Sequence, residues 1–212
     1  MNDKNIQFYN NLGVEPFKKL SEVGGFSSHK DLELVFPYID GSNSIVEVGA
    51  GFGRCLDFFI NKGFEGKLIA VEKAVPYLEY LRKHYADRVD ILDADVKKLE
   101  LEEKADTVLW MFSGIIDFSR EEQIQTLQRL AGCLNEKGKL VIDIPKLGFR
   151  TYAEHTDEQH LRFDSEYGLL ECYIPSVEDI TEYQEKAGFA GFIRLDYSTS
   201  SGKQRTVYIL NK

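Results

Sequence analysis

The sequence has few cysteines. Cys55, Cys133 and Cys172 are the only three in 212 residues, and they lie far apart. No CxxC pair or Cys/His cluster brings potential ligands together, and the four histidines also lack the spacing of metal ligands. We therefore predict neither a disulfide framework nor a metal site. Scattered free cysteines are typical of a reducing compartment, so the cytoplasm is the expected location.

Long apolar runs are missing as well. No stretch approaches the ~18 apolar residues of a membrane-spanning helix, and the first ten residues, MNDKNIQFYN, lack the apolar core of a signal peptide. Hydrophobic residues still make up 43% of the chain, which is enough for the core of one domain of this length. We expect a folded protein without a membrane partner, and composition excludes a disordered or fibrous chain.

Positive charge is scarce relative to negative charge. Lys and Arg together number 26 against 35 Asp and Glu, which gives a formal net charge of −9. Nucleic-acid phosphates are usually bound by a basic surface, so no nucleic-acid partner is predicted, although the sum leaves a local basic patch open.

Short β-branched runs alternate with helical segments along most of the chain, which is typical of a parallel sheet with helices on both faces. The expected strands are residues 44–48, 67–72, 89–92, 107–111 and 140–144. The expected helices are residues 54–62, 76–85 and 121–134, the last opened by a capping box from Ser119 to Glu122. The pattern predicts an α/β, doubly wound core.

The pattern changes at both ends of this core. Near the C-terminus, a helix over 176–187 precedes two strand-like runs, 190–197 and 205–210, and the short Ser/Gly connection between them predicts an antiparallel hairpin. The sheet is therefore expected to have seven strands, mostly parallel, with one reversed strand at its end. Near the N-terminus, a helix from Ser28 to about Phe36 is expected to end before Pro37.

No repeat or linker marks a second domain, so residues 1–212 are predicted to form a single domain. Residues 1–40 are expected to form a helical lid, and the charged insert over 146–174 is expected to cover the site where the substrate of the protein would bind.

A glycine-rich turn carries the chemistry. Residues 45–53 read IVEVGAGFG, a strand that enters a turn in which glycines let the backbone pass close to a ligand. Glu72 follows Gly53 at about the spacing of a carboxylate that binds ribose hydroxyls. A nicotinamide site would require a third glycine where Arg54 stands. The motif therefore favours a nucleoside without a pyrophosphate.

These residues resemble the class I S-adenosylmethionine-dependent methyltransferases, over about residues 30–212. The family's motifs are matched in order by VEVGAGFGR, LIAVEK, ILDADV, ADTVLWMFSGIIDF and NEKGKLVIDIP, followed by the terminal hairpin. The resemblance implies a Rossmann-like methyltransferase fold, S-adenosylmethionine as cofactor and methyl transfer by in-line displacement. Since such a transfer mainly needs a well-placed acceptor and a dry site, no catalytic residue is assigned.

The resemblance also implies a set of site residues. Glu72 would bind the ribose, Asp95 the adenine amino group, and Glu47 the ammonium end of the cofactor. Arg54 would lie near the methionine carboxylate. The predicted cofactor-binding residues are Tyr9, Glu47, Gly49, Ala50, Gly51, Gly53, Arg54, Glu72, Lys73, Asp95, Val96 and Met111. The predicted substrate-binding residues are Phe8, Phe112, Ser113 and Tyr152.

Each of these residues also has a purely structural interpretation. Glu47 could be a strand carboxylate bonded to backbone amides, and Arg54 an ordinary solvated helix residue. Phe8 and Tyr9 could simply staple the N-terminal segment. Replacement of Glu72 by alanine is expected to weaken cofactor binding and to leave folding nearly unchanged, because Glu72 ends its strand.

The acceptor is expected to be a small molecule. The loop after the fourth strand reads MFSG, which departs from the Asn/Asp-Pro-Pro-Tyr/Phe motif of the branches that methylate amino groups of bases. Polyamine synthases share the fold but carry an additional carboxylate pair in this region, where only Asp117 is near. A non-catalytic or regulatory cofactor-binding protein and a methyltransferase acting on a protein remain alternatives. The acceptor, the methylated atom and the oligomeric state are not predicted.

Overall fold

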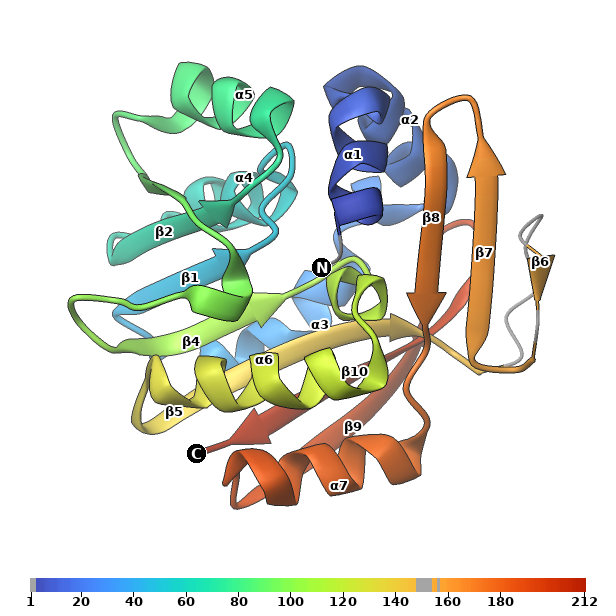
Figure 1. Cartoon of the computed structure of the whole chain (residues 1–212). Helices are drawn as coiled ribbons and strands as arrows, with labels where there is room; N and C mark the ends of the chain where they lie inside the picture. Colours follow the sequence, from blue (N-terminus) through green and yellow to red (C-terminus); the bar gives the residue numbers. More distant parts are fainter. Residues whose placement is uncertain (1–2, 148–153, 156) are drawn as a thin grey trace.

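The computed structural model describes residues 3–147, 154–155 and 157–212, and its centre is a seven-stranded sheet (Figure 1). The strand order is β3-β2-β1-β4-β5-β10-β9. The parallel strands on one side are β3 (Asp90–Asp93), β2 (Lys67–Glu72), β1 (Ser44–Val48), β4 (Ala105–Trp110) and β5 (Leu134–Pro145). The hairpin of β9 (Gly191–Ser198) and β10 (Gln204–Asn211) completes the sheet. The expected fold class is confirmed.

The reversed strand differs from expectation in its position. β10 pairs antiparallel with both β5 and β9, so it lies inside the sheet and β9 forms the edge. The burial pattern agrees, because β10 has six consecutive buried residues whereas β9 has none. The more apolar strand of the hairpin therefore occupies the inner place.

Helices cover both faces of the sheet. The side chains of Val46 and Val108 pack in a core cluster with α6 (Arg120–Gly132) and α7 (Val177–Ala187). The alternate side chains of Ile45 and Leu109 pack in a second cluster with α3 (Lys30–Ile39), α4 (Arg54–Asn61) and α5 (Val75–Tyr85). Burial on both faces explains why the central strands read as nearly continuous apolar runs. None of the described helices is long and apolar enough to cross a membrane.

The helix that was predicted to end before Pro37 is α3, and its predicted end is wrong, because α3 continues to Ile39 with Pro37 inside it. Proline removes a single donor here, the one that would bond the Glu33 carbonyl. Ile39 is 2% exposed, and Lys139 Nζ donates to the Tyr38 carbonyl at 2.6 Å. Core packing and this bond hold the last turn in helical form.

Two further helices precede α3, namely α1 (Asp3–Leu12) and α2 (Val14–Gly24), followed by the short turn η1 (Phe26–Ser28). The end of α2 contacts the β9–β10 connection, since Ser201 Oγ donates to the Gly24 carbonyl at 2.7 Å and Ser200 Oγ to the Gly25 carbonyl at 2.9 Å. The beginning and the end of the chain are thereby joined.

The insert forms a small antiparallel sheet of β6 (Glu154–His155), β7 (His160–Ser165) and β8 (Gly168–Tyr173), which lies beside α1 (Figure 1). Buried Asn5 of α1 donates to the Glu171 carbonyl at 2.8 Å, and Glu171 N donates back to Asn5 Oδ1 at 3.1 Å. The small sheet therefore supports α1. Tyr152, a predicted substrate residue, lies outside the described residues.

Candidate functional site

A pocket lies at the carboxyl ends of β1, β2 and β4, and residues of α1 and α2 contribute to its wall. It encloses about 920 Å³ of empty space, counting the part open to solvent, which is in the range of small-ligand sites. Of the predicted site residues, the lining includes Tyr9, Glu47, Gly49, Ala50, Gly51, Arg54, Glu72, Lys73, Asp95, Val96, Met111 and Phe112. Gly53, Phe8 and Ser113 do not line it.

The glycine-rich turn forms the floor of the pocket. Gly49, Gly51 and Gly53 have φ of 66°, 55° and 84°, values that favour glycine. A Cβ on Gly49 would meet no atom within 4 Å, so the backbone there faces open space. A Cβ on Gly53 would lie 2.6 Å from the Tyr85 ring. Gly53 therefore allows α4 to begin against Tyr85, which explains its absence from the lining.

Glu72 fixes the turn through its carboxylate. Oε2 accepts the Gly51 amide at 2.8 Å, and Oε1 accepts the amides of Lys73 at 2.7 Å and Ala74 at 2.8 Å. Burial raises the pKa of this carboxyl, although the three amides act in the opposite direction. Oε2 can still accept a further hydrogen bond, so Glu72 can both organise the loop and bind a hydroxyl group.

Glu47 brings an incompletely bonded carboxylate to the pocket. It is 5% exposed, and within the described part of the chain its Oε2 atom has no hydrogen-bond partner. Burial raises the pKa of Glu47 to about 7, while the nearby Cys55 thiol and Arg54 guanidinium act in the opposite direction. The interpretation of Glu47 as a carboxylate satisfied by backbone amides is therefore wrong.

Arg54 is also buried, at 7% exposure, so it is not a solvated helix residue. Its guanidinium forms two hydrogen bonds with the carboxylate of Asp31, at 3.0 and 2.5 Å. Arg54 reaches the pocket with its charge already paired, a feature that the sequence did not reveal.

A second ion pair lies at the other end of the pocket. Lys73 Nζ is 2.9 Å from Asp95 Oδ2, and Asp95 Oδ1 accepts the Lys97 amide at 3.0 Å. Burial alone would raise the pKa of Asp95, but these two donors lower it below its usual value. Asp95 is thus an ionised acceptor beside Val96, at the turn that follows β3.

The loop after β4 places Phe112 in the pocket lining and Ser113 outside it. Both residues have positive φ, 52° and 69°, which is unusual for residues other than glycine. Phe112 packs against Phe17 and Phe26, with ring centroids 5.3 and 4.4 Å apart. Ser113 instead accepts a hydrogen bond from Arg205 at 2.6 Å, outside the pocket lining.

The two predicted N-terminal aromatics also separate. Tyr9 lines the pocket, whereas Phe8 packs in the core. The centroid of the Phe8 ring lies 6.2 Å from that of the Tyr167 ring. Consecutive residues of a helix point about 100° apart, so α1 presents one of them to the pocket and the other to the small sheet. None of the described residues of the 146–174 insert lines the pocket, so they support α1 instead of forming a wall.

Asp117 is a pocket residue that sequence reasoning did not assign to the site. It ends the short turn η3 (Gly114–Asp117), is 5% exposed, and accepts a hydrogen bond from the Tyr9 hydroxyl at 2.8 Å. The signal that would have found it is an acidic residue in the otherwise apolar run Ile115–Phe118. Phe17 and Tyr77 were missed as well, because they reach the pocket from separate helices.

Comparisons with known proteins agree with this geometry. Residues 45–138 match the family model described as a methyltransferase domain. No curated protein matches the sequence.

Three solved structures illustrate the likeness of fold. The 1,6-didemethyltoxoflavin-N1-methyltransferase of Burkholderia thailandensis, with S-adenosylhomocysteine bound, is 16% identical; the match covers 92% of this chain and 82% of that chain, with a TM-score of 0.68. An S-adenosylmethionine-dependent methyltransferase of Clostridium acetobutylicum is 13% identical; the match covers 92% of this chain and 98% of that chain, with a TM-score of 0.68. An amino pentose methyltransferase of Micromonospora echinaspora is 13% identical; the match covers 91% of this chain and 95% of that chain, with a TM-score of 0.65. The chain therefore has the fold of class I S-adenosylmethionine-dependent methyltransferases, and residues 45–138 match a methyltransferase domain.

Proposed function

We propose that this protein is an S-adenosylmethionine-dependent methyltransferase that acts on a small-molecule acceptor, held between the glycine-rich turn and the N-terminal helices. The observation that carries the proposal is the arrangement of the pocket. Cofactor-type residues line one part of it, while Tyr9 of α1 and Phe17 of α2 contribute to its wall. A covered site of this kind suits a compact ligand better than an extended polymer.

The residues present fit S-adenosylmethionine. Gly49 leaves open space above its backbone, and Oε2 of Glu72 keeps a free acceptor position for a ribose hydroxyl. Asp95 can accept a hydrogen bond from the adenine amino group, beside the apolar surface of Val96. The unpartnered Oε2 of Glu47 suits the ammonium of the methionine part. Arg54, paired with Asp31, keeps Glu47 in a field that favours its charged form.

In this mechanism the sulfonium of the cofactor supplies a methyl carbon that is already activated for displacement. The protein has to align the acceptor with that carbon and exclude water. Phe17, Tyr77 and Phe112 are aromatic lining residues that suit the second task. We propose that α1 and α2 act as a lid and that residues 1–212 work as a single domain.

The names of structural neighbours support a small acceptor without identifying it. The Burkholderia enzyme is crystallised with 1,6-didemethyltoxoflavin, and the Micromonospora enzyme is an amino pentose methyltransferase. The net charge of −9 gives no general attraction for a nucleic acid.

Two measurements test the proposal. Calorimetry should show binding of S-adenosylmethionine and S-adenosylhomocysteine with a stoichiometry near one, and no binding of NAD. Incubation of a fractionated cell extract with methyl-labelled cofactor should place the label in the small-molecule fraction. Label mainly in RNA or protein would reject the small acceptor, and binding of NAD alone would reject the cofactor.

A further inference from the structure

Asp117 is a pocket carboxylate to which the proposed cofactor site gives no role. Its Oδ2 atom accepts the Tyr9 hydroxyl at 2.8 Å, and its Oδ1 atom accepts the Cys172 thiol at 3.7 Å. Both partners are neutral groups. Among the described residues, no lysine, arginine or histidine pairs with Asp117, although the positive charge of the N-terminus favours its charged form. A buried carboxylate without a side-chain cation is costly, so this arrangement favours a positively charged ligand.

The other charges of the pocket are already accounted for. Arg54 pairs with Asp31 and Lys73 with Asp95, so neither cation is available to Asp117. Three backbone amides bond Glu72, and Glu47 lies in the field of Arg54. Asp117 is thus a lining carboxylate whose side chain is bonded by two neutral side-chain donors, and positive charge on a bound acceptor would complete it.

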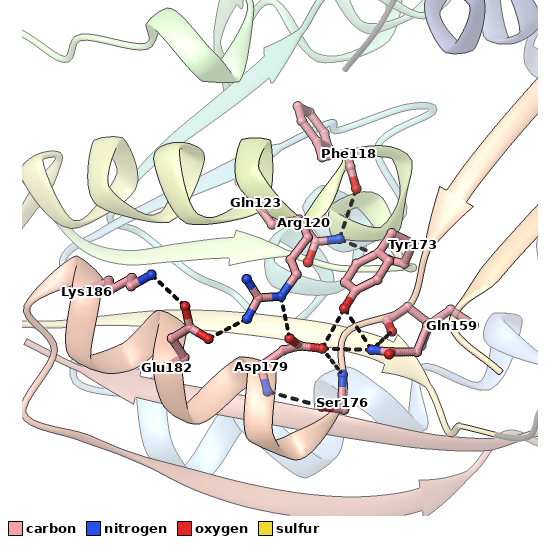
Figure 2. Close-up of polar contacts among 10 residues, drawn as sticks. Phe118, Arg120, Gln123, Gln159, Tyr173, Ser176, Asp179, Glu182 and Lys186 are labelled. Atoms are coloured by element: carbon pink, nitrogen blue, oxygen red, sulfur yellow. Dashed lines mark hydrogen bonds and ion pairs between the residues drawn. The ribbon is translucent and has the colours of Figure 1, made fainter. Parts of the chain in front are cut away.

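The turn that carries Asp117 is held from several sides. Gln123 Nε2 lies 3.0 Å from the Ile115 carbonyl, 3.1 Å from the Phe118 carbonyl and 2.9 Å from the Tyr173 carbonyl. Figure 2 shows Gln123 in contact with Phe118 and Tyr173, and Tyr173 in turn bonded to Asp179. Asn5 donates to the carbonyl of Asp117 itself at 2.9 Å. A carboxylate fixed in this way is preorganised for a ligand.

The surroundings of Asp117 suit an amine. Tyr9, Trp110 and Phe118 also line the pocket, and aromatic rings attract cations as well as excluding water. Burial raises the pKa of Asp117 to about 7, against the opposite effect of two donors, Tyr9 of α1 and Cys172 of β8, and of the positive N-terminus. The pKa values of those donors are raised as well, so both remain protonated near neutral pH.

We propose that Asp117 binds the amino group of an amine acceptor and removes its proton before methyl transfer; this inference rests on the proposed function. The acceptor enters as R–NH₃⁺ beside the carboxylate. One N–H bond breaks and its proton passes to Asp117, which leaves R–NH₂ with a free electron pair. That pair forms the new N–CH₃ bond while the bond from carbon to sulfur breaks and its electrons stay on sulfur. Asp117 then returns its proton to solvent.

Sinefungin provides a test that needs no knowledge of the acceptor. In this analogue an amine-bearing carbon replaces the methylated sulfonium. S-adenosylhomocysteine has an unsubstituted sulfur at the same position, with neither a methyl group nor an amine on it. The ratio of the two affinities therefore reports what the protein offers to a cationic nitrogen at this position. Both ligands should be titrated into the wild type, Asp117→Asn and Asp164→Asn. The last is a matched control, since Asp164 is an exposed carboxylate on β7.

We expect Asp117→Asn to reduce the preference for sinefungin by about ten-fold while S-adenosylhomocysteine binds as in the wild type, and Asp164→Asn to change neither affinity. An unchanged preference in Asp117→Asn would overturn the assignment of Asp117. Equal loss of both ligands would also overturn it, because Asp117 would then only anchor α1. If the wild type binds neither ligand, the proposed function itself fails.

A measurement on the wild type alone covers the case in which Asp117→Asn does not fold. The preference for sinefungin should rise several-fold between about pH 6 and about pH 8, as Asp117 loses its proton. A preference that stays constant over this range would overturn the inference.

Discussion

The carboxylate of Glu72 accepts the backbone amide of Gly51 at 2.8 Å, which ties the end of β2 to the glycine-rich turn. Because the same carboxylate also holds the amides of Lys73 and Ala74, it shapes the loop as well as facing the pocket. Its position at the end of a strand suggested from the sequence that folding would not depend on it. The three bonds argue otherwise.

We therefore predict that Glu72→Ala lowers both cofactor affinity and stability, the latter by about 1–3 kcal/mol, because buried amides lose their acceptor. Thermal melting and calorimetry with S-adenosylhomocysteine measure the two effects. Asp93→Ala is the control, since Asp93 is the register neighbour of Glu72 at the end of the adjacent strand β3 but is exposed. A melting temperature equal to that of the wild type would show that Glu72 has no structural role.

The stability of the ligand-free protein should depend on Asp117 in a pH-dependent way. Its pKa is about 7 in the folded protein and about 3.9 in the unfolded chain, so only the folded state keeps the proton between these values. Stability contributed by this group is therefore present below about pH 4 and is lost as the pH rises to about 7.

Asp117→Asn removes that loss. We predict that the variant matches the wild type below about pH 4 and exceeds it near pH 8 by at least about 1.4 kcal/mol, the equivalent of one pKa unit. Urea unfolding at both pH values, with Asp164→Asn as the charge control, provides the measurement. A variant that is less stable than the wild type near pH 8 would contradict the raised pKa.

Two arginines of the C-terminal hairpin offer a matched comparison. Arg205 of β10 pairs with Asp143 inside the protein, where both side chains are buried, whereas Arg194 of β9 pairs with Asp196 at the surface. We predict that Arg205→Leu costs about 3–5 kcal/mol, because it leaves a buried carboxylate without its cation. Arg194→Leu should cost less than about 1 kcal/mol. Similar losses measured by urea unfolding would refute this distinction.

The docking of α1 should depend on Asn5. Its side-chain amide bonds the carbonyls of Asp117 and Glu171, so Asn5→Ala leaves two buried acceptors with fewer donors. Hydrogen exchange followed by mass spectrometry should become faster in residues 3–12 and stay unchanged in β1 and β4. Gln7→Ala, an exposed position on the same helix, should have no such effect. Faster exchange across the whole sheet would mean that Asn5 supports the entire fold.

The sequence predicted the strands with little error where both faces of the sheet are covered. β1 and β2 have the predicted bounds, because apolar runs end there at polar or glycine residues. β5 begins at Leu134 instead of residue 140, since pairing of Ala105 with Leu134 and of Lys139 with Asn211 extends it through a hydrophilic stretch. No local pattern reveals such long-range pairing.

The site was predictable where a motif determines the backbone and hidden where distant segments meet. The turn over Gly49 and Gly51 was recognised because only glycine suits its backbone. The contact between Tyr9 and Asp117 spans 108 positions, and that between Arg54 and Asp31 depends on the packing of α3 against α4. Ser113 was wrongly predicted to line the pocket. Its left-handed backbone lets its hydroxyl bond Arg205 instead, and nothing in the sequence indicates that conformation.

The bonds from Ser200 and Ser201 to the end of α2 have a consequence for synthesis on the ribosome. The N-terminal helices leave the ribosome long before Ser200 and Ser201, the residues that bond Gly25 and Gly24, are translated. A chain that has not yet added the hairpin therefore lacks the donors that hold the end of α2, although β1, β2 and β4 are already complete. In a nascent chain stalled at that point, the part of the pocket wall that α2 contributes is not yet fixed.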